Sequence, residues 1–166
     1  MRRMKMEDNN TGGLSTMPKY SAFDIANYFL FKAQEATEED QELISNLKLQ
    51  KLVYYAQGLH VAIYGGPLFS DKIEAWTYGP VIPELYHYYK VHSSNGIRAD
   101  ESFDPSLIDE DTQQFLDEIY EVFGQFSAIR LMNLAHSDQC WINAGIGNEI
   151  TCDAMGEDLK KYIKDG

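Results

Sequence analysis

Residues 47–90 read LKLQKLVYYAQGLHVAIYGGPLFSDKIEAWTYGPVIPELYHYYK and contain most of the eleven tyrosines of the chain. In the first half of this stretch, apolar side chains recur at the spacing of one face of an α-helix. Ser45 or Asn46 can cap such a helix, and Gly65-Gly66-Pro67 can end it, because glycine tolerates the left-handed conformation and proline cannot continue a helix. The stretch therefore predicts one long helix, whose apolar face is Leu49, Leu52, Val53, Ala56, Leu59, His60 and Ile63.

The second half of the stretch has no helical period until its end. Residues 67–82 contain short runs of β-type residues and a turn at Tyr78-Gly79-Pro80, which predicts a loop or a short β-ribbon. Pro83 fits the first position of a helix, where its missing N–H is not needed, and we expect this helix to reach about His92.

Further helical patterns lie on both sides of this stretch. Ser21 can cap the first of them, with Asp24 three residues later in an arrangement close to a capping box. The others are residues 115–123 followed by Gly124, a helix capped by Ser127 and ending near His136, and a last amphipathic helix from Thr151 to Ile163. We therefore expect a mainly α, single-domain bundle of about six helices, with at most a short β-ribbon or loop around residues 67–82.

The expected domain does not include the start of the chain. Residues 1–20 are polar and aperiodic, which predicts a flexible leader, and residues 21–166 are long enough for one domain with a sizeable core. The acidic stretch 35–42 and the polar stretch 93–110 are expected to be connections between helices.

The chain is acidic, and its charge is unevenly distributed. The net charge is −12, and residues 99–166 alone carry 4 basic and 15 acidic side chains. Because nucleic-acid binding draws most of its affinity from lysine and arginine on phosphates, direct binding of DNA or RNA is disfavoured. No apolar run approaches the length that crosses a bilayer, and no apolar segment follows the basic residues at the start, so we expect a cytoplasmic protein with no membrane contact.

A search for catalytic signatures finds little. The chain contains no GxxxxGK[ST], GxGxxG, GxSxG or HExxH motif, and its two cysteines fit ordinary thiols in a reducing compartment. Only His136, Asp138 and Cys140 combine imidazole, carboxylate and thiol within a few residues. They lack a further ligand at a standard spacing, so a structural loop is the favoured interpretation. We predict no catalytic residue, no metal and no cofactor.

The aromatic side chains of residues 47–90 allow two interpretations. Each can belong to the core, but tryptophan and tyrosine are also enriched at the most energetically important positions of protein interfaces. A turn that presents Trp76 and Tyr78 beside Glu74 could anchor a partner, and Gly79-Pro80 would stiffen that turn and lower the entropic cost of binding. The residues concerned are Tyr55, Tyr64, Trp76, Tyr78, Tyr86 and Tyr89.

Three motifs between Leu47 and Tyr86 resemble the signature of the Panacea domain, the SocA-like antitoxin family: LKLQKLVYYAQG, GGPLF and EAWTYGPVIPELY. Weaker similarity in SAFDIANYFL, SAIRLMNLAH and EITCDAMGEDLKKYI extends the resemblance over Ser21 to Ile163. Two positions depart from the family pattern. Ala135 stands where the family usually has threonine before the histidine, and Cys140 stands where proline usually precedes tryptophan.

The resemblance implies an α-dominated domain that neutralises a toxin encoded nearby, in the setting of phages or other mobile elements. Its main partner would be that cognate toxin protein. Inhibition by direct binding and delivery of the toxin to a AAA+ protease both occur in the family, and the sequence does not separate them. Some members carry an N-terminal helix-turn-helix region, for which the roughly 20 residues before residue 21 are too few.

The resemblance, together with the aromatic turn, defines the candidate site. The segment Glu74–Pro83 is expected to pack on the long helix and to offer a rim for the toxin. The candidate partner-binding residues are Glu74, Trp76, Tyr78, Gly79, Pro80, Tyr55 and Lys51. Two alternatives remain: a small metal-dependent or thiol enzyme that uses His136, Asp138 and Cys140, and a phage-associated interaction protein without a toxin.

Overall fold

The computed structural model describes residues 4–5, 17–36 and 43–164. Most of the predicted leader and of the predicted acidic loop therefore lie outside the described residues. The remaining chain is mainly helical, as predicted. Its helices are α1 (Ala22–Ala36), α2 (Asn46–Tyr64), α3 (Pro83–Tyr89), α4 (Glu110–Phe123), α5 (Ala128–His136), α6 (Gln139–Ala144) and α7 (Cys152–Leu159). Short 3₁₀ turns follow or join them at η2 (Lys90–His92), η3 (Pro105–Leu107) and η4 (Lys160–Tyr162).

The ends of the helices follow local sequence signals. The Ser45 hydroxyl accepts a hydrogen bond from the Lys48 N–H at 3.3 Å, and Gly65 ends α2 with a φ of 82°. Ser127 caps α5 and Thr151 caps α7 in the same way as Ser45 caps α2. The caps predicted at Ser45, Gly65 and Ser127 are confirmed, because each depends only on residues within one turn. Helix α6 was not predicted, since its six residues are too few for an apolar period to be recognised.

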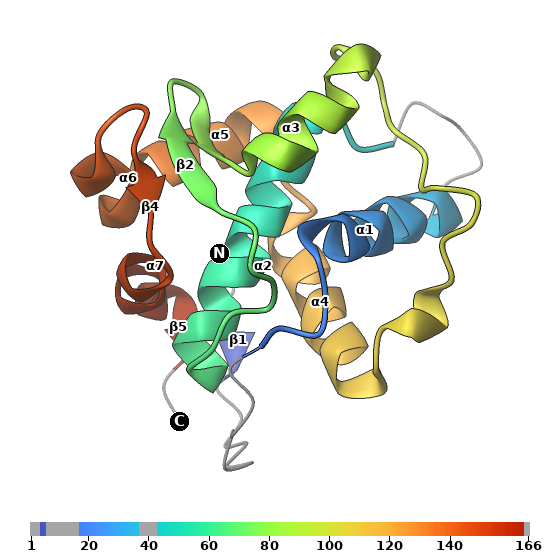
Figure 1. The fold of residues 1–166 in the computed structure, drawn as a ribbon, viewed down its shortest axis with the longest axis horizontal. Helices are drawn as coiled ribbons and strands as arrows, with labels where there is room; N and C mark the ends of the chain where they lie inside the picture. The colour runs from blue at the N-terminus through green and yellow to red at the C-terminus, as the bar shows by residue number, and fades with distance from the viewer. Residues whose placement is uncertain (1–3, 6–16, 37–42, 165–166) are drawn as a thin grey trace.

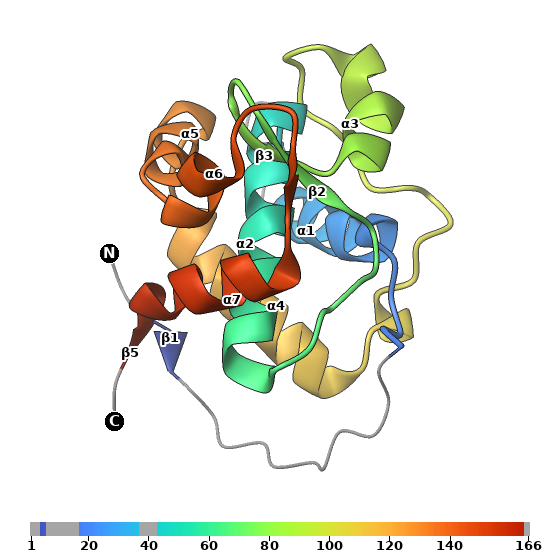
Figure 2. The same cartoon turned by 60° about the vertical axis from the view of Figure 1, so that its left-hand side comes forward.

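Helix α2 is the centre of the molecule (Figure 1). Helices α1, α4, α5 and α7 all pack against it, and its predicted apolar positions Leu49, Leu52, Val53, Ala56 and Leu59 are fully buried. Helix α7 crosses α2 closely (Figure 2), because glycines lie at the crossing. A Cβ atom on Gly58 would be 2.3 Å from Leu159 Cδ1, and one on Gly156 would be 2.6 Å from Val61 Cγ1.

A small antiparallel sheet covers one side of α2. The predicted ribbon is a hairpin of β2 (Ile73–Trp76) and β3 (Gly79–Val81), and β4 (Glu149–Ile150) adds a third strand on the other edge of β2. Strand β4 was not predicted, because two residues carry no alternating pattern and their partner is distant in sequence. A separate parallel pair joins β1 (Met4–Lys5) to β5 (Ile163–Lys164). None of the described helices is both long and apolar enough to cross a bilayer.

Two buried glutamines of α2 hold the chain that follows it. Gln57 accepts hydrogen bonds from the N–H groups of Leu68 and Phe69, at 2.7 and 3.3 Å, and donates to the Phe69 carbonyl at 2.7 Å. Gln50 accepts from the Ile82 N–H at 2.9 Å. The segment that leads from α2 to the hairpin and onward to α3 is therefore attached to α2 at both ends.

Candidate protein-binding groove

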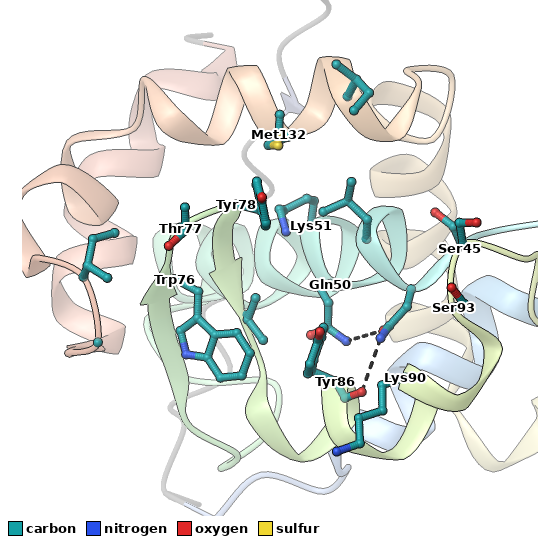
Figure 3. Close-up of a pocket in the computed structure, with 17 residues that line it drawn as sticks. Ser45, Gln50, Lys51, Trp76, Thr77, Tyr78, Tyr86, Lys90, Ser93 and Met132 are labelled. Carbon is teal, nitrogen blue, oxygen red and sulfur yellow. Dashed lines mark hydrogen bonds between the residues drawn. The ribbon is translucent and has the colours of Figure 1, made fainter.

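A groove of about 820 Å³ lies between the hairpin tip, α3, α5 and the N-terminal turns of α2 (Figure 3). We call it the hairpin groove. Part of its wall is apolar and exposed. Tyr78 at the hairpin tip is 66% exposed, Ile129 at the start of α5 is 57% exposed and Ile146 before β4 is 60% exposed. Its other lining residues are Ser45, Asn46, Leu47, Gln50, Lys51, Trp76, Thr77, Val81, Tyr86, Lys90, Ser93, Ser94, Met132 and Gly147.

The hairpin is held in shape by contacts of Trp76. Its indole N–H donates to Glu74 Oε1 at 3.0 Å, and its ring meets Tyr86 of α3 edge to face at 5.0 Å. Directly opposite Trp76 in the ladder is Gly79, whose φ of 110° is disfavoured for a residue with a side chain. The exposed side chain of Tyr78 therefore projects from a rigid tip.

Helix α3 forms one wall of the hairpin groove, and side-chain amides of α2 fix its position. The Gln50 amide donates to Asn46 Oδ1 at 2.8 Å, and the Asn46 amide donates to the Tyr86 carbonyl at 3.3 Å, as the dashed lines of Figure 3 show. Together with the bond from Gln50 to Ile82, these contacts connect α2 to the start and the middle of α3. Sequence reasoning did not identify this role of the motif residue Gln50, because its partner is a backbone group more than thirty residues away.

Lys51 lies at the bottom of the hairpin groove and has no exposed surface. Its ammonium nitrogen is the one buried side-chain nitrogen or oxygen of the described residues for which no hydrogen-bond partner is found. Burial lowers the pKa of this amine to about 7. Its stem passes against the backbone of the hairpin, since a Cβ atom on Gly79 would be 2.7 Å from Lys51 Cε. Glycine at position 79 thus leaves the space that the lysine occupies.

The charge of the hairpin groove is opposite to that of the whole protein. Its lining includes Lys51 and Lys90 but no aspartate or glutamate among the described residues, whereas the chain has a net charge of −12. The first turn of α2 also contributes to the lining, and the N-terminus of a helix carries partial positive charge.

The predicted cluster of His136, Asp138 and Cys140 has structural contacts. Asp138 is fully buried and accepts hydrogen bonds from the hydroxyls of Tyr54, Tyr55 and Tyr162, at 2.8, 2.9 and 2.7 Å. Lys161 lies 2.9 Å from the same carboxylate. Burial raises the pKa of Tyr54 and Tyr55 well above the ordinary value, so both hydroxyls stay protonated and donate.

Cys140 is a buried thiol rather than an activated one. Burial raises its pKa to about 12, so the thiolate that a nucleophile or a metal ligand requires is disfavoured. Its backbone N–H donates to Asp158 Oδ2 at 3.0 Å, a bond that a proline at this position could not make. Among the residues that the structure describes, no group of three or more histidine, cysteine, aspartate or glutamate side chains could hold a metal ion.

Two side chains of this corner support the hairpin groove. His136 Nε2 lies 3.0 Å from the Thr77 carbonyl, and the Trp141 indole N–H donates to the Trp76 carbonyl at 3.0 Å. The corner between α5 and α6 therefore holds the tip of the hairpin from behind. The departures from the family pattern at Ala135 and Cys140 leave both of these contacts in place.

The structure brings most of the predicted partner-binding residues to one place, but at different depths. Tyr78 is exposed, Glu74 and Trp76 are partly buried, and Gly79 and Pro80 are buried within β3. Tyr55 lies beneath the groove region in the core, fully buried, with its ring stacked on Phe123 at 4.3 Å. Among the groove residues that sequence reasoning missed are three apolar ones, Ile129, Met132 and Ile146.

A weak signal for these missed residues was available in the sequence. Ile129 is a large apolar residue outside the buried face of α5, which is formed by Leu131 and Ala135. An apolar residue at such a position is compatible with a binding surface, but single exposed apolar residues are also common. Only their assembly around one groove makes the signal specific.

Comparison with known proteins identifies the family of the chain. The family described as "Antitoxin SocA-like, Panacea domain" matches residues 49–142, which include most of α2, the hairpin, α3, α5 and the supporting corner. Antitoxin SocA of Caulobacter vibrioides (strain NA1000 / CB15N) is 30% identical over 140 residues, which cover 73% of this chain and 74% of that protein. No solved structure matches the chain. The chain therefore belongs to the SocA-like antitoxin family, whose members carry the Panacea domain.

Proposed function

We propose that this protein is an antitoxin that neutralises a cognate toxin, encoded nearby, by direct protein–protein binding in the hairpin groove. The observation that carries the proposal is the exposure of Tyr78, Ile129 and Ile146 around one groove. Large apolar side chains that are exposed together, rather than singly, are typical of interaction sites. Membership of an antitoxin family supports a toxin as the partner.

Within this proposal, the predicted residues have different roles. Tyr78 contacts the toxin directly, and Trp76 with Glu74 gives the rim its shape. Gly79 and Pro80 keep the tip rigid, which lowers the entropic cost of binding. Tyr55 is too deeply buried for direct contact and supports the groove from the core.

The first test is a growth assay with the neighbouring gene. Induction of the toxin alone should arrest growth, and co-expression of this protein should restore it, with both chains purifying as one complex. Tyr78→Ala should weaken the complex about fivefold to thirtyfold, because a tyrosine that anchors an interface contributes about 1–2 kcal/mol.

Tyr88→Ala is the matched control. Tyr88 is 60% exposed, close to the value for Tyr78, but it lies on the part of α3 that does not line the hairpin groove. Its replacement should leave affinity within about twofold. Equal effects of the two substitutions would contradict the placement of the interface, and the absence of any toxic neighbour would contradict the antitoxin function.

The same assay separates two mechanisms of neutralisation. A stable complex with an unchanged amount of toxin supports inhibition by binding. Restored growth without a stable complex, combined with loss of the toxin that requires a AAA+ protease, would instead identify this protein as an adaptor for proteolysis. Both mechanisms need the binding surface, so Tyr78→Ala should impair growth rescue in either case.

A further inference from the structure

Lys51 differs from the other buried polar residues of the described chain. Asn46, Gln50, Gln57 and Asp138 are also buried, and each makes the hydrogen bonds given above. The amine of Lys51 makes none. A buried polar group without a partner is rare in native proteins and disfavours folding, so its presence in a groove points to a partner supplied by another molecule.

The surroundings of this amine favour an anion. The described lining of the hairpin groove contains a second lysine, Lys90, and no carboxylate, and the first turn of α2 adds partial positive charge. The lining also contains the apolar side chains of Tyr78 and Met132, which Figure 3 shows near Lys51. A carboxylate that enters such a site is attracted strongly, because little water remains to screen the charges.

We propose that the hairpin groove binds an acidic side chain of the toxin, an aspartate or a glutamate flanked by apolar residues, and that its carboxylate pairs with the Lys51 ammonium. This inference rests on the proposed function and adds the chemistry that the toxin must present. The flanking apolar residues of the toxin pack on Tyr78 and on the exposed side chains of α5.

The position of Lys51 favours a side chain over the C-terminus of the toxin. Figure 3 shows Lys51 between Thr77 on one side and Ser45 and Ser93 on the other, so the groove continues in both directions from the amine. An internal segment can cross such a groove and place one side chain at its middle. A chain end would fill only half of it.

The carboxylate reaches Lys51 when the flexible side chain of the lysine turns toward the groove. In the free protein the amine has no exposed surface, and Gly79 lies directly against its stem. The hairpin tip stays in place, because the carbonyls of Trp76 and Thr77 are held by the corner between α5 and α6. The pair then forms at the lysine, and the bound segment of the toxin excludes water from it.

The test measures toxin affinity for the full-length protein and two lysine variants. Lys51→Met keeps an unbranched apolar side chain but removes the charge. It should weaken toxin binding about tenfold to a hundredfold, because this is the loss of affinity expected when a charge-assisted hydrogen bond is removed. Lys90→Met removes the exposed lysine of the same groove, and it should change affinity by less than about fivefold, because exposed ion pairs contribute little.

The pH dependence of toxin affinity is a second test of the pair between Lys51 and the carboxylate. The titratable or charged groups around Lys51 are Tyr78 and Glu74 of the hairpin, Tyr86 of α3, Lys90 of η2 and His136 of α5. Since the free amine has a pKa of about 7 and its charged form pairs with the carboxylate, wild-type affinity should fall by up to about tenfold per pH unit above that value, until it reaches the affinity of Lys51→Met. Lys51→Met should lose this dependence.

Substitutions in the toxin identify the carboxylate. One Asp→Asn or Glu→Gln change should weaken binding to the wild type by the same factor as Lys51→Met, and should have no further effect on the Lys51→Met variant. If instead an extension of the toxin C-terminus reproduces the loss, the terminal carboxylate is the ligand and the proposal of a side chain is wrong.

Failure of this inference can be told apart from failure of the proposed function. A toxin that binds wild type and Lys51→Met equally at every pH overturns the role of Lys51 and leaves the antitoxin function standing. A neighbouring protein that does not bind the wild type at all overturns both proposals.

Discussion

Gln50, Lys51 and Gln57 are buried polar positions on α2, and they affect stability in different ways. The glutamines satisfy backbone groups of the segment that follows α2, so their burial is compensated by hydrogen bonds. The lysine has no such compensation in the free protein. Its depressed pKa reflects this cost, since the folded protein disfavours the charged amine.

Replacing Lys51 should stabilise the free protein while weakening toxin binding. The pKa falls from 10.5 in the unfolded chain to about 7 in the folded protein, so between these values the unfolded chain binds a proton that the native state releases. Wild-type stability therefore rises with pH across this window, and the full cost applies below pH 7. Lys51→Met should gain about 4 kcal/mol at pH 7 and progressively less toward pH 10.

Urea denaturation of both proteins at several pH values measures this difference. Lys90→Met is the control, and its stability should stay within about 0.5 kcal/mol of the wild type because this side chain is exposed. A Lys51→Met variant that is less stable than the wild type at pH 7 would mean that the amine has a partner in the free protein.

At the scale of elements, the hairpin groove depends on how separate segments are attached to α2. Gln57 holds the turn at Leu68 and Phe69, Gln50 holds the start of α3, and the indole of Trp141 holds the hairpin from the opposite side. Each attachment joins a side chain to backbone groups. The walls of the groove can therefore keep their places although the connecting segments have little regular structure.

Gln57→Leu should destabilise the protein by about 2–3 kcal/mol. The substitution leaves the N–H groups of Leu68 and Phe69 and the Phe69 carbonyl without their partner in the core. Thermal or urea unfolding followed by circular dichroism measures the change. Gln139→Leu, at an exposed glutamine of α6, should change stability by less than about 0.5 kcal/mol, and a similar loss in both variants would refute this role of Gln57.

At the scale of the whole molecule, the buried carboxylate of Asp138 joins three parts of the chain. It precedes α6, it accepts hydrogen bonds from Tyr54 and Tyr55 of α2, and it pairs with Lys161 of η4 near the C-terminus. The residues that support the hairpin tip lie on either side of it in sequence, at His136 and Trp141. The position of the groove is thus linked to the packing of the core.

Asp138→Ala should lower the stability of the whole domain by about 3–5 kcal/mol, because it removes the buried carboxylate that accepts from three tyrosine hydroxyls and leaves Lys161 only its ion pair with Asp158. For a chain of this length the melting temperature should fall by roughly 10 °C or more. Calorimetry should show a single transition moved to lower temperature. Asp153→Ala on the exposed side of α7 is the control, with a loss below about 1 kcal/mol; an equally small loss for Asp138→Ala would contradict its joining role.

Local features of the fold could be read from the residues alone. The length of α2, its caps at Ser45 and Gly65, and the ribbon around Tyr78-Gly79-Pro80 were all predicted, since each depends on neighbours within a few positions. Helix α6 and strand β4 were missed because they are short and are held by distant partners. For the candidate site, the sequence predicted the β-ribbon that forms the hairpin, but it did not identify the opposite wall of the groove at Ile129 and Met132.

The sequence was sufficient to establish a mainly helical domain, its longest helix and its family, because apolar spacing, capping residues and glycine–proline turns act over short distances. It could not tell a buried polar residue that is satisfied from one that is not. In the sequence, Gln50, Lys51 and Asp138 are simply polar residues. In the structure, Gln50 binds a backbone N–H, the Lys51 amine has no hydrogen-bond partner, and Asp138 joins three segments of the chain. Such differences arise only when residues far apart in the chain meet, because the partners that decide the free energy of a buried polar group are contributed by other elements.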